Sequence, residues 1–388
     1  MTPARMRVPY RTAALAALAA ALAWTPAAGQ APVPPPSGSP DRGWTVPATP
    51  APSPISREEH AARRRALAAE MSDGVLVVMG ADEPGASWAA FAQGSNFRYL
   101  TGFNEPSAVL VIARRGSEVT EQLFVAPRDP SREIWDGVLL GTEGAERLTG
   151  IPSRSVVEVQ DALGRMLDGV TTLYILTPER ARGFPTVEQQ FIQSLRRENP
   201  SLRRVLEMTD DIRALRMSKS PAELDMLRRA VYITVLAHRE AARAIEPGMN
   251  EFEIHALIEA TFRRYGAERP GFGSIVGSGP NATTLHYRRA DRFMQPGEVV
   301  VMDIGASYNG YTADVTRTVP VSGRFSPEQR AIYAIVLRAQ KTAEGEARAG
   351  VTMGQLQRIA SGVLADGLVQ LGLMESDSAT YDCAQGEQ

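Results

Sequence analysis

The stretch from residue 271 to residue 323 constrains the fold most, because it contains a strong hairpin signal. The pair Asn309-Gly310 separates an apolar run, residues 299–305, from a second strand-like run, residues 312–319. A two-residue turn of type I′ needs positive φ at both positions, which Asn and Gly tolerate best. The sequence therefore predicts two antiparallel strands joined by a two-residue turn.

The register of this hairpin follows from the position of its turn. If the Asn-Gly pair forms the turn, Asp303 faces Thr316 and Gly305 faces Asp314. Side chains alternate between the two faces of a strand, so Asp314 shares a face with Thr316. Asp303 and Asp314 then become diagonal neighbours, ~7–8 Å apart along the backbone and within reach of one shared ligand.

Two neighbouring carboxylates repel one another unless a positive group lies between them. Asp303 also interrupts an apolar strand, where an uncompensated charge is costly. A pair of divalent cations resolves both problems, because two-metal hydrolytic sites are bridged by carboxylates. The alternative is that Arg317 or a backbone amide neutralises one of the two aspartates.

A histidine follows a turn-rich loop upstream of the hairpin. His286 lies shortly after residues 277–281, with the sequence GSGPN. It is either a proton donor or substrate ligand near the metals, or an ordinary strand histidine. The glycine loop lacks the spacing of a phosphate-binding loop. Charged neighbours on helical patterns lead us to expect solvated helix positions for His60, His238 and His255.

The first residues have the three-part plan of a secretory signal peptide. Three arginines precede a short Ala/Leu-rich run, and small residues follow, which places cleavage near Gly29. Residues 1–29 are the predicted signal peptide, with an uncleaved membrane anchor as the alternative. The apolar run is too short for a stable membrane span. Residues 30–55 are rich in proline and form a predicted linker.

Composition narrows the compartment and the partners. The formal net charge is −2, so the chain has no broad basic field for nucleic acid. It has a single cysteine, Cys383, so no intrachain disulfide can form. Export without disulfides favours a periplasmic or extracellular location in a bacterium.

The remaining chain divides into two predicted domains. Residues 56–209 alternate short apolar strand patterns with helical patterns, which indicates an α/β layer. Residues 210–388 begin with long helices. Ser-Pro-x-Glu at Ser220 and Ser-Pro-x-Gln at Ser326 are capping boxes that start two long helices. Each is followed by a glycine-containing break and an amphipathic helix, which suggests an internal duplication or a chance similarity between such helices.

Several segments of the chain resemble aminopeptidase P, the Xaa-Pro aminopeptidase of the pita-bread metallopeptidase family. The segments that carry the resemblance are NFRYLTGFNEPSAVLVI, REIWDG, IVGSGPNATTLHY and VVMDIGASYNGYTADVTRTVPVSGRFSPEQRAIYAIVL. The resemblance covers about residues 56–373. It implies an N-terminal creatinase-like α/β domain and a C-terminal α+β pita-bread domain. It also agrees with the suggested internal duplication.

The resemblance also implies a metal site. In that family two aspartates, one histidine and two glutamates hold two divalent metal ions, typically Mn²⁺. Asp303 and Asp314 match the two aspartates, and His286 matches a histidine that contacts the substrate. The later histidine and the two glutamates have no match before Gln388. We therefore expect a C-terminally truncated, incomplete pita-bread domain that lacks three metal ligands and is inactive alone.

For the complete enzyme, the resemblance implies removal of the N-terminal residue from peptides with proline in the second position. Metal-bound hydroxide would attack the scissile carbonyl, and His286 would steady the oxyanion or the substrate. Two rivals remain: a metal-free creatinase-like hydrolase and a non-catalytic binding protein on the same fold. The sequence leaves the oligomeric state open, a homo-oligomer included.

Overall fold

The structure is a computed structural model that describes residues 52–83, 91–176 and 187–376. The predicted signal peptide and most of the proline-rich linker lie outside these ranges, as does Cys383. None of the helices within the described ranges combines the length and the apolar character needed to cross a lipid bilayer.

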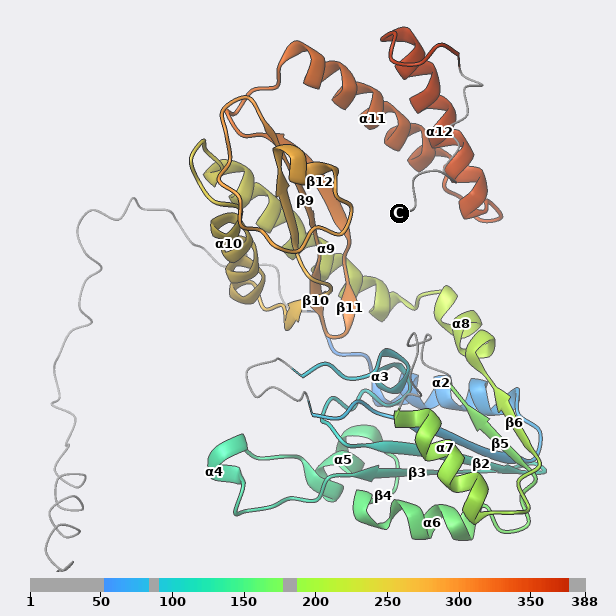
Figure 1. The fold of residues 1–388 in the computed structure, drawn as a ribbon. Coiled ribbons are helices and arrows are strands. Elements are labelled where there is room, and N and C mark those ends of the chain that lie inside the picture. The colour runs from blue at the N-terminus through green and yellow to red at the C-terminus, as the bar shows by residue number, and fades with distance from the viewer. Residues whose placement is uncertain (1–51, 84–90, 177–186, 377–388) are drawn as a thin grey trace, which may run out of the picture. The chain divides into compact units, whose positions relative to one another are not determined.

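A six-stranded mixed sheet forms the first folded part, in the order β4-β3-β2-β1-β5-β6 (Figure 1). Its strands are β1 (Gly74–Met79), β2 (Val109–Arg115), β3 (Glu118–Val125), β4 (Ser153–Ser155), β5 (Thr172–Ile175) and β6 (Arg204–Glu207). The β1–β2 and β2–β3 pairs are antiparallel, and the β3–β4, β1–β5 and β5–β6 pairs are parallel. The predicted α/β layer is therefore confirmed.

Helices cover both faces of this sheet because the side chains of its strands alternate. The helices are α2 (Arg57–Ala69), α3 (Ser95–Thr101), α4 (Glu133–Asp136), α5 (Gly141–Thr149), the 3₁₀ turn η1 (Val156–Glu158), α6 (Val159–Met166) and α7 (Val187–Glu198). In β1, Leu76 and Val78 belong to a core shared with α2 and α3. Val75 and Val77 belong to a second core shared with α6 and α7.

The second folded part combines long helices with a small sheet. Its helices are α8 (Thr209–Met217), α9 (Pro221–Ala244), α10 (Glu251–Arg264), α11 (Pro327–Glu346) and α12 (Met353–Gln370). Its strands and 3₁₀ turn are β7 (Arg269–Pro270), β8 (Ile275–Ser278), η2 (Gly279–Thr283), β9 (Val299–Ile304), β10 (Ala306–Tyr308), β11 (Tyr311–Thr312) and β12 (Val315–Pro320). The strand orders are β12-β9-β8 and β11-β10-β7.

The central strand β9 buries one face against α9 and α10. Val300, Met302 and Ile304 are fully buried in one core with residues of both helices. The alternate side chains, among them Val301 and Asp303, are half-buried on the opposite face. This alternation directs Asp303 away from the helices that back the sheet.

Local capping signals start the long helices where the sequence predicts. Ser220 and Ser326 each form a complete capping box with a proline in the first turn. Asn250 and Thr352 form capping boxes at the starts of α10 and α12. Both predicted helix–turn–helix units are therefore present. The duplication of the whole half-domain stays a prediction.

The predicted register is confirmed, but the predicted second strand is not continuous. Asp303 pairs with Thr316, and Asn309 and Gly310 both have positive φ. The ladder is interrupted at Gly305 and at residues 313–314. A Cβ on Gly305 would lie 1.7 Å from the main-chain oxygen of Ala313, so the two segments approach too closely for regular pairing.

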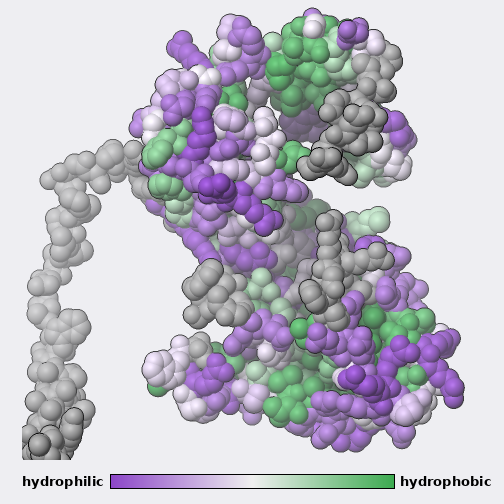
Figure 2. Space-filling model, viewed as in Figure 1, coloured by the Kyte–Doolittle hydropathy of each residue, from purple (hydrophilic) through white to green (hydrophobic). Residues whose placement is uncertain are grey.

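The helix pair α11–α12 packs mainly on itself. Gly367 of α12 is buried, and a Cβ there would lie 2.5 Å from Ile335 of α11, so glycine permits the close approach. Figure 2 shows apolar side chains gathered at the surface over this pair. Its large exposed apolar residues are Ile332, Val336, Leu337, Met353, Leu371 and Leu373.

Candidate metal centre

The hairpin brings Asp303 and Asp314 together. Burial, followed by the charge and the hydrogen-bonding contact of the Asp303 carboxylate, raises the pKa of Asp314 above its ordinary value. Asp303 pairs with Thr316, two residues beyond Asp314, so the alternation of side chains places both carboxylates on the same side of the hairpin. Asp314 is exposed, whereas the Oδ1 atom of Asp303 is buried without a hydrogen-bond partner among the described residues.

No basic side chain in the described ranges forms an ion pair with either aspartate. Arg317, the alternative partner, instead donates a hydrogen bond of 2.7 Å to the main-chain oxygen of Thr316. A buried carboxylate oxygen without a donor is costly, and hard divalent cations prefer such oxygen ligands. The pair therefore fits a divalent cation by its chemistry.

Helix α9 braces the hairpin from behind, next to the interruption of the ladder. The Thr234 hydroxyl accepts a hydrogen bond of 2.9 Å from the amide of Ala306. One turn later, His238 Nε2 lies 2.9 Å from the main-chain oxygen of Val315. A carbonyl can only accept, so Nε2 carries the proton. These contacts hold the backbone on both sides of the segment that presents Asp314.

The expectation of solvated helix positions is wrong for two of the four histidines. His60 and His238 are buried, and burial lowers the pKa of both imidazoles. The reason is tertiary: each ring approaches a main-chain oxygen of a distant segment, Tyr99 for His60 and Val315 for His238. His255 is half-buried on α10 beside Glu259.

His286 lies in an exposed turn after η2, not within a strand. Among the described residues it forms no hydrogen bond or ion pair with Asp303 or Asp314. Its neighbour Tyr287 is buried and anchors the turn. The structure thus brings the two aspartates together and leaves the catalytic role of His286 a prediction.

The described residues contain no cluster of three or more His, Cys, Asp or Glu side chains arranged to hold a metal ion. Within this part of the chain, the two aspartates are the candidate ligand pair. Their metal-binding role stays a prediction.

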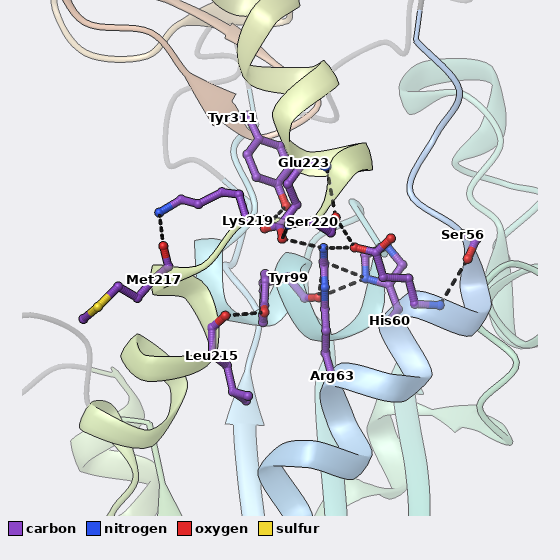
Figure 3. Close-up of polar contacts among 11 residues, drawn as sticks. Ser56, His60, Arg63, Tyr99, Leu215, Met217, Lys219, Ser220, Glu223 and Tyr311 are labelled. Carbon is purple, nitrogen blue, oxygen red and sulfur yellow. Dashed lines mark hydrogen bonds and ion pairs between the residues drawn. The ribbon is translucent and has the colours of Figure 1, made fainter. Parts of the chain in front are cut away.

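A second polar cluster lies where α2 and α3 meet α9 and the hairpin turn (Figure 3). Arg63 lies 3.3 Å from Glu223, and both side chains are buried. The Tyr311 hydroxyl donates a 2.9 Å hydrogen bond to Glu223. Sequence reasoning interpreted Glu223 only as part of a capping box. Glu223 does complete the capping box, but no local sequence pattern indicates that Arg63 and Tyr311 are its partners.

A cavity of about 770 Å³ lies beside this cluster. Its lining includes His60, Arg63, Tyr99, Glu223 and Tyr311. Neither aspartate lines it. The cavity is therefore separate from the paired carboxylates.

The α/β domain and the helix-backed hairpin with paired acids belong to a two-domain metallopeptidase of the pita-bread type, as two family descriptions show. The family description "Aminopeptidase P, N-terminal domain" matches residues 60–174, and "Metallopeptidase family M24" matches residues 225–380. The chain belongs to the Xaa-Pro aminopeptidases, also called aminopeptidase P. Members of this family are metal-dependent enzymes that remove the N-terminal residue preceding a proline.

Individual relatives agree with this assignment. The Xaa-Pro aminopeptidase of Escherichia coli K12 is 35% identical over 334 residues, which cover 84% of this chain and 76% of that protein. Human Xaa-Pro aminopeptidase 3 is 31% identical over 74% of this chain and 57% of its own length.

Solved structures show the same fold. The Escherichia coli aminopeptidase P structure with the inhibitor Pro-Leu has a TM-score of 0.77 and 32% identity, and covers 83% of this chain and 75% of that one. Pseudomonas aeruginosa aminopeptidase PepP has a TM-score of 0.76 and 31% identity over 83% and 75% of the two chains.

Proposed function

We propose that Asp303 and Asp314 are two of the ligands that hold two divalent metal ions, Mn²⁺, for hydrolysis of Xaa-Pro peptides. The observation that carries the proposal is the buried Oδ1 of Asp303, which has no hydrogen-bond partner in the described ranges and lies beside a second carboxylate whose pKa is raised. Two acids held together without a cation destabilise each other, so the arrangement is explained if it serves a cation.

Each residue of the proposed site would have a separate role. Asp303 and Asp314 would fix the metal position from a hairpin whose backbone is held by Thr234 and His238. When bound, divalent ions lower the pKa of water and polarise a carbonyl group. His286, exposed on its turn, would donate a hydrogen bond to the substrate as charge develops on its oxygen.

The proposal includes export. The arginine-rich start, the short apolar run and the small residues near Gly29 support secretion to the periplasm or beyond. N-terminal sequencing of protein isolated from a bacterial envelope fraction would test this part. A mature chain that begins near Gln30 is the expected result, and an intact Met1 would contradict it.

The test of the activity uses the full-length reading frame, the form for which the resemblance implies activity, with Xaa-Pro and Xaa-Ala tripeptides and with and without added Mn²⁺. We expect Mn²⁺-dependent release of the first residue from the Xaa-Pro peptide only. Loss of a residue that merely supports a metal ligand costs about 10–100-fold in activity. Asp303→Ala should therefore reduce turnover at least about 100-fold.

Two outcomes would contradict the proposal. Turnover unaffected by Asp303→Ala would exclude the paired aspartates from the site. Xaa-Pro peptide binding without turnover, at any Mn²⁺ concentration, would favour the alternative of a non-catalytic binding protein.

A further inference from the structure

The loop that carries His286 is closed at its base by one buried carboxylate. Glu251, the first residue of α10, is fully buried. Its carboxylate lies at the base of the loop between the end of β8 and Arg292, whereas His286 is exposed in the middle of that loop. The reaction chemistry proposed above assigns no role to Glu251.

The two oxygens of Glu251 hold opposite ends of the loop. Oε1 accepts hydrogen bonds of 2.7 Å from both the amide and the hydroxyl of Ser278, at the entrance of the loop. Oε2 accepts 2.8 Å from the Tyr287 hydroxyl and 3.2 Å from the Arg292 amide, at its exit. Asn281 adds a contact of 3.2 Å to Oε1.

Further contacts support the same closure. The amide of Glu251 donates a hydrogen bond of 2.9 Å to the main-chain oxygen of Arg292. Glu251 therefore both donates a hydrogen bond to Arg292 and accepts one from it. The Arg292 guanidinium reaches back 3.0 Å to the Ser278 hydroxyl and pairs with Glu298. The Asn250 side chain donates to the main-chain oxygen of Asp291.

The carboxylate stays ionised despite its burial. Burial by itself would raise the pKa of Glu251, but the hydrogen bonds from Ser278, Tyr287 and Asn281 outweigh it and lower the pKa. The helix N-terminus also favours a negative charge at this position. Burial, with the hydrogen bond to Glu251, raises the pKa of Tyr287 to about 12, so its hydroxyl remains a donor. The closure is therefore maintained at neutral pH.

Tyr287 links this closure to the exposed histidine. Tyr287 is 8% exposed and its hydroxyl is held by Glu251, whereas Leu285, two residues earlier, is 87% exposed. His286 stands between the two, so its backbone position depends on the anchored tyrosine next to it. Among the described residues, no hydrogen bond or ion pair holds the His286 side chain.

We propose that Glu251 is a positioning residue that sets the place of His286 through Tyr287 and the two ends of the loop. The proposal rests on the proposed function, in which His286 contacts the substrate. Glu251 itself does not touch the reacting atoms. Its loss would loosen the loop and reduce turnover of bound peptide while the metal affinity of the two aspartates stays unchanged.

The test compares Glu251→Gln, Glu251→Ala and Tyr287→Phe in the whole chain. Glutamine keeps one acceptor oxygen but turns an amide group toward the Arg292 N–H. Glu259→Gln is the matched control, because Glu259 lies on the same helix but pairs with His255. Imidazole NMR separates the responses, since the chain has four histidines.

We expect the His286 imidazole signals to shift and broaden in the Glu251 variants and in Tyr287→Phe. Amide exchange within residues 279–291 should become about 10–100-fold faster, the effect of losing a hydrogen bond to a charged group. Glu259→Gln should change His255 alone. If Glu251→Ala does not fold, Glu251→Gln and Tyr287→Phe decide the question.

Unchanged His286 signals and unchanged loop exchange in folded Glu251→Gln and Tyr287→Phe would overturn the positioning role. These readouts need neither metal nor turnover, so a failed peptidase assay would affect the proposed function alone. In an active enzyme, Glu251→Gln should lower kcat more than it raises KM. His286→Ala should likewise affect kcat more than KM. A loosened loop with unchanged kcat would overturn the catalytic link.

Discussion

Arg63 Nη2 lies 3.3 Å from Glu223 Oε2, and the two side chains are 7% and 4% exposed. The guanidinium also pairs with Glu59 at 2.6 Å and stacks over the Tyr99 ring. Because Tyr311 donates to the same glutamate, this ion pair joins the start of the N-terminal domain to the turn of the acid-bearing hairpin (Figure 3).

Removal of Arg63 should destabilise the protein strongly, because the charge of Glu223 would stay buried without its ion-pair partner. Arg63→Met should cost about 3–5 kcal/mol of the free energy of unfolding, and Arg63→Met/Glu223→Gln less than the sum of its single variants. Urea unfolding of the two single variants and the double variant measures the coupling. Arg65→Met on the exposed side of α2 is the control. Additive single effects would show that the two residues act independently.

Stability should fall on the acid side because of His60. Burial lowers the pKa of His60 below its ordinary value of 6.5. The unfolded state therefore binds a proton more readily, and the stabilisation present above pH 6.5 is lost as pH falls toward the lower folded-state pKa. The slope contributed by one proton is at most about 1.4 kcal/mol per pH unit.

Urea unfolding between pH 7.5 and pH 5 on the wild type, His60→Gln and His255→Gln would measure this slope. His60→Gln should flatten the curve, whereas His255→Gln, on a half-buried histidine, should leave it nearly unchanged. An identical slope in the wild type and His60→Gln would show that other groups govern the acid loss.

Divalent cations should stabilise the folded protein through the paired aspartates. A ligand at 100 times its Kd adds about 2.7 kcal/mol to the free energy of unfolding. Mn²⁺ should therefore raise the Tm of the wild type and not that of Asp303→Asn or Asp314→Asn. Chelator should reverse the shift. An equal rise in all three proteins would place the bound metal elsewhere.

The interruption of the hairpin should depend on Gly305. A Cβ at this position would lie 1.7 Å from the Ala313 oxygen and 2.9 Å from the Phe272 ring, so Gly305→Ala forces the backbone to move. We expect a loss of about 4 kcal/mol or more, together with loss of the Mn²⁺-induced Tm shift.

Gly345→Ala is the matched control for this variant. It lies in α11, and an added Cβ meets nothing within 4 Å. Alanine there should stabilise by roughly 0.5–1 kcal/mol. Equal Tm changes in the two variants would contradict the steric account of Gly305.

The class of protein and the acid pair could be predicted because their signals are local. The Asn309-Gly310 turn imposes the register, and the register alone makes Asp303 and Asp314 neighbours. Capping boxes likewise involve residues only three positions apart, so Ser220 and Ser326 start their helices as predicted. The break after Gly305 was missed because it depends on close packing between two segments, not on strand propensity.

What the sequence by itself determined is thus the hairpin, its register, the helix starts and the family. Only the tertiary structure decided which polar groups are buried and with what partner. His60 meets the Tyr99 oxygen 39 residues away, and Glu251 meets Arg292 41 residues away. Such contacts depend on how separate elements pack, and a helix pattern looks the same whether its polar residue meets water or a buried partner.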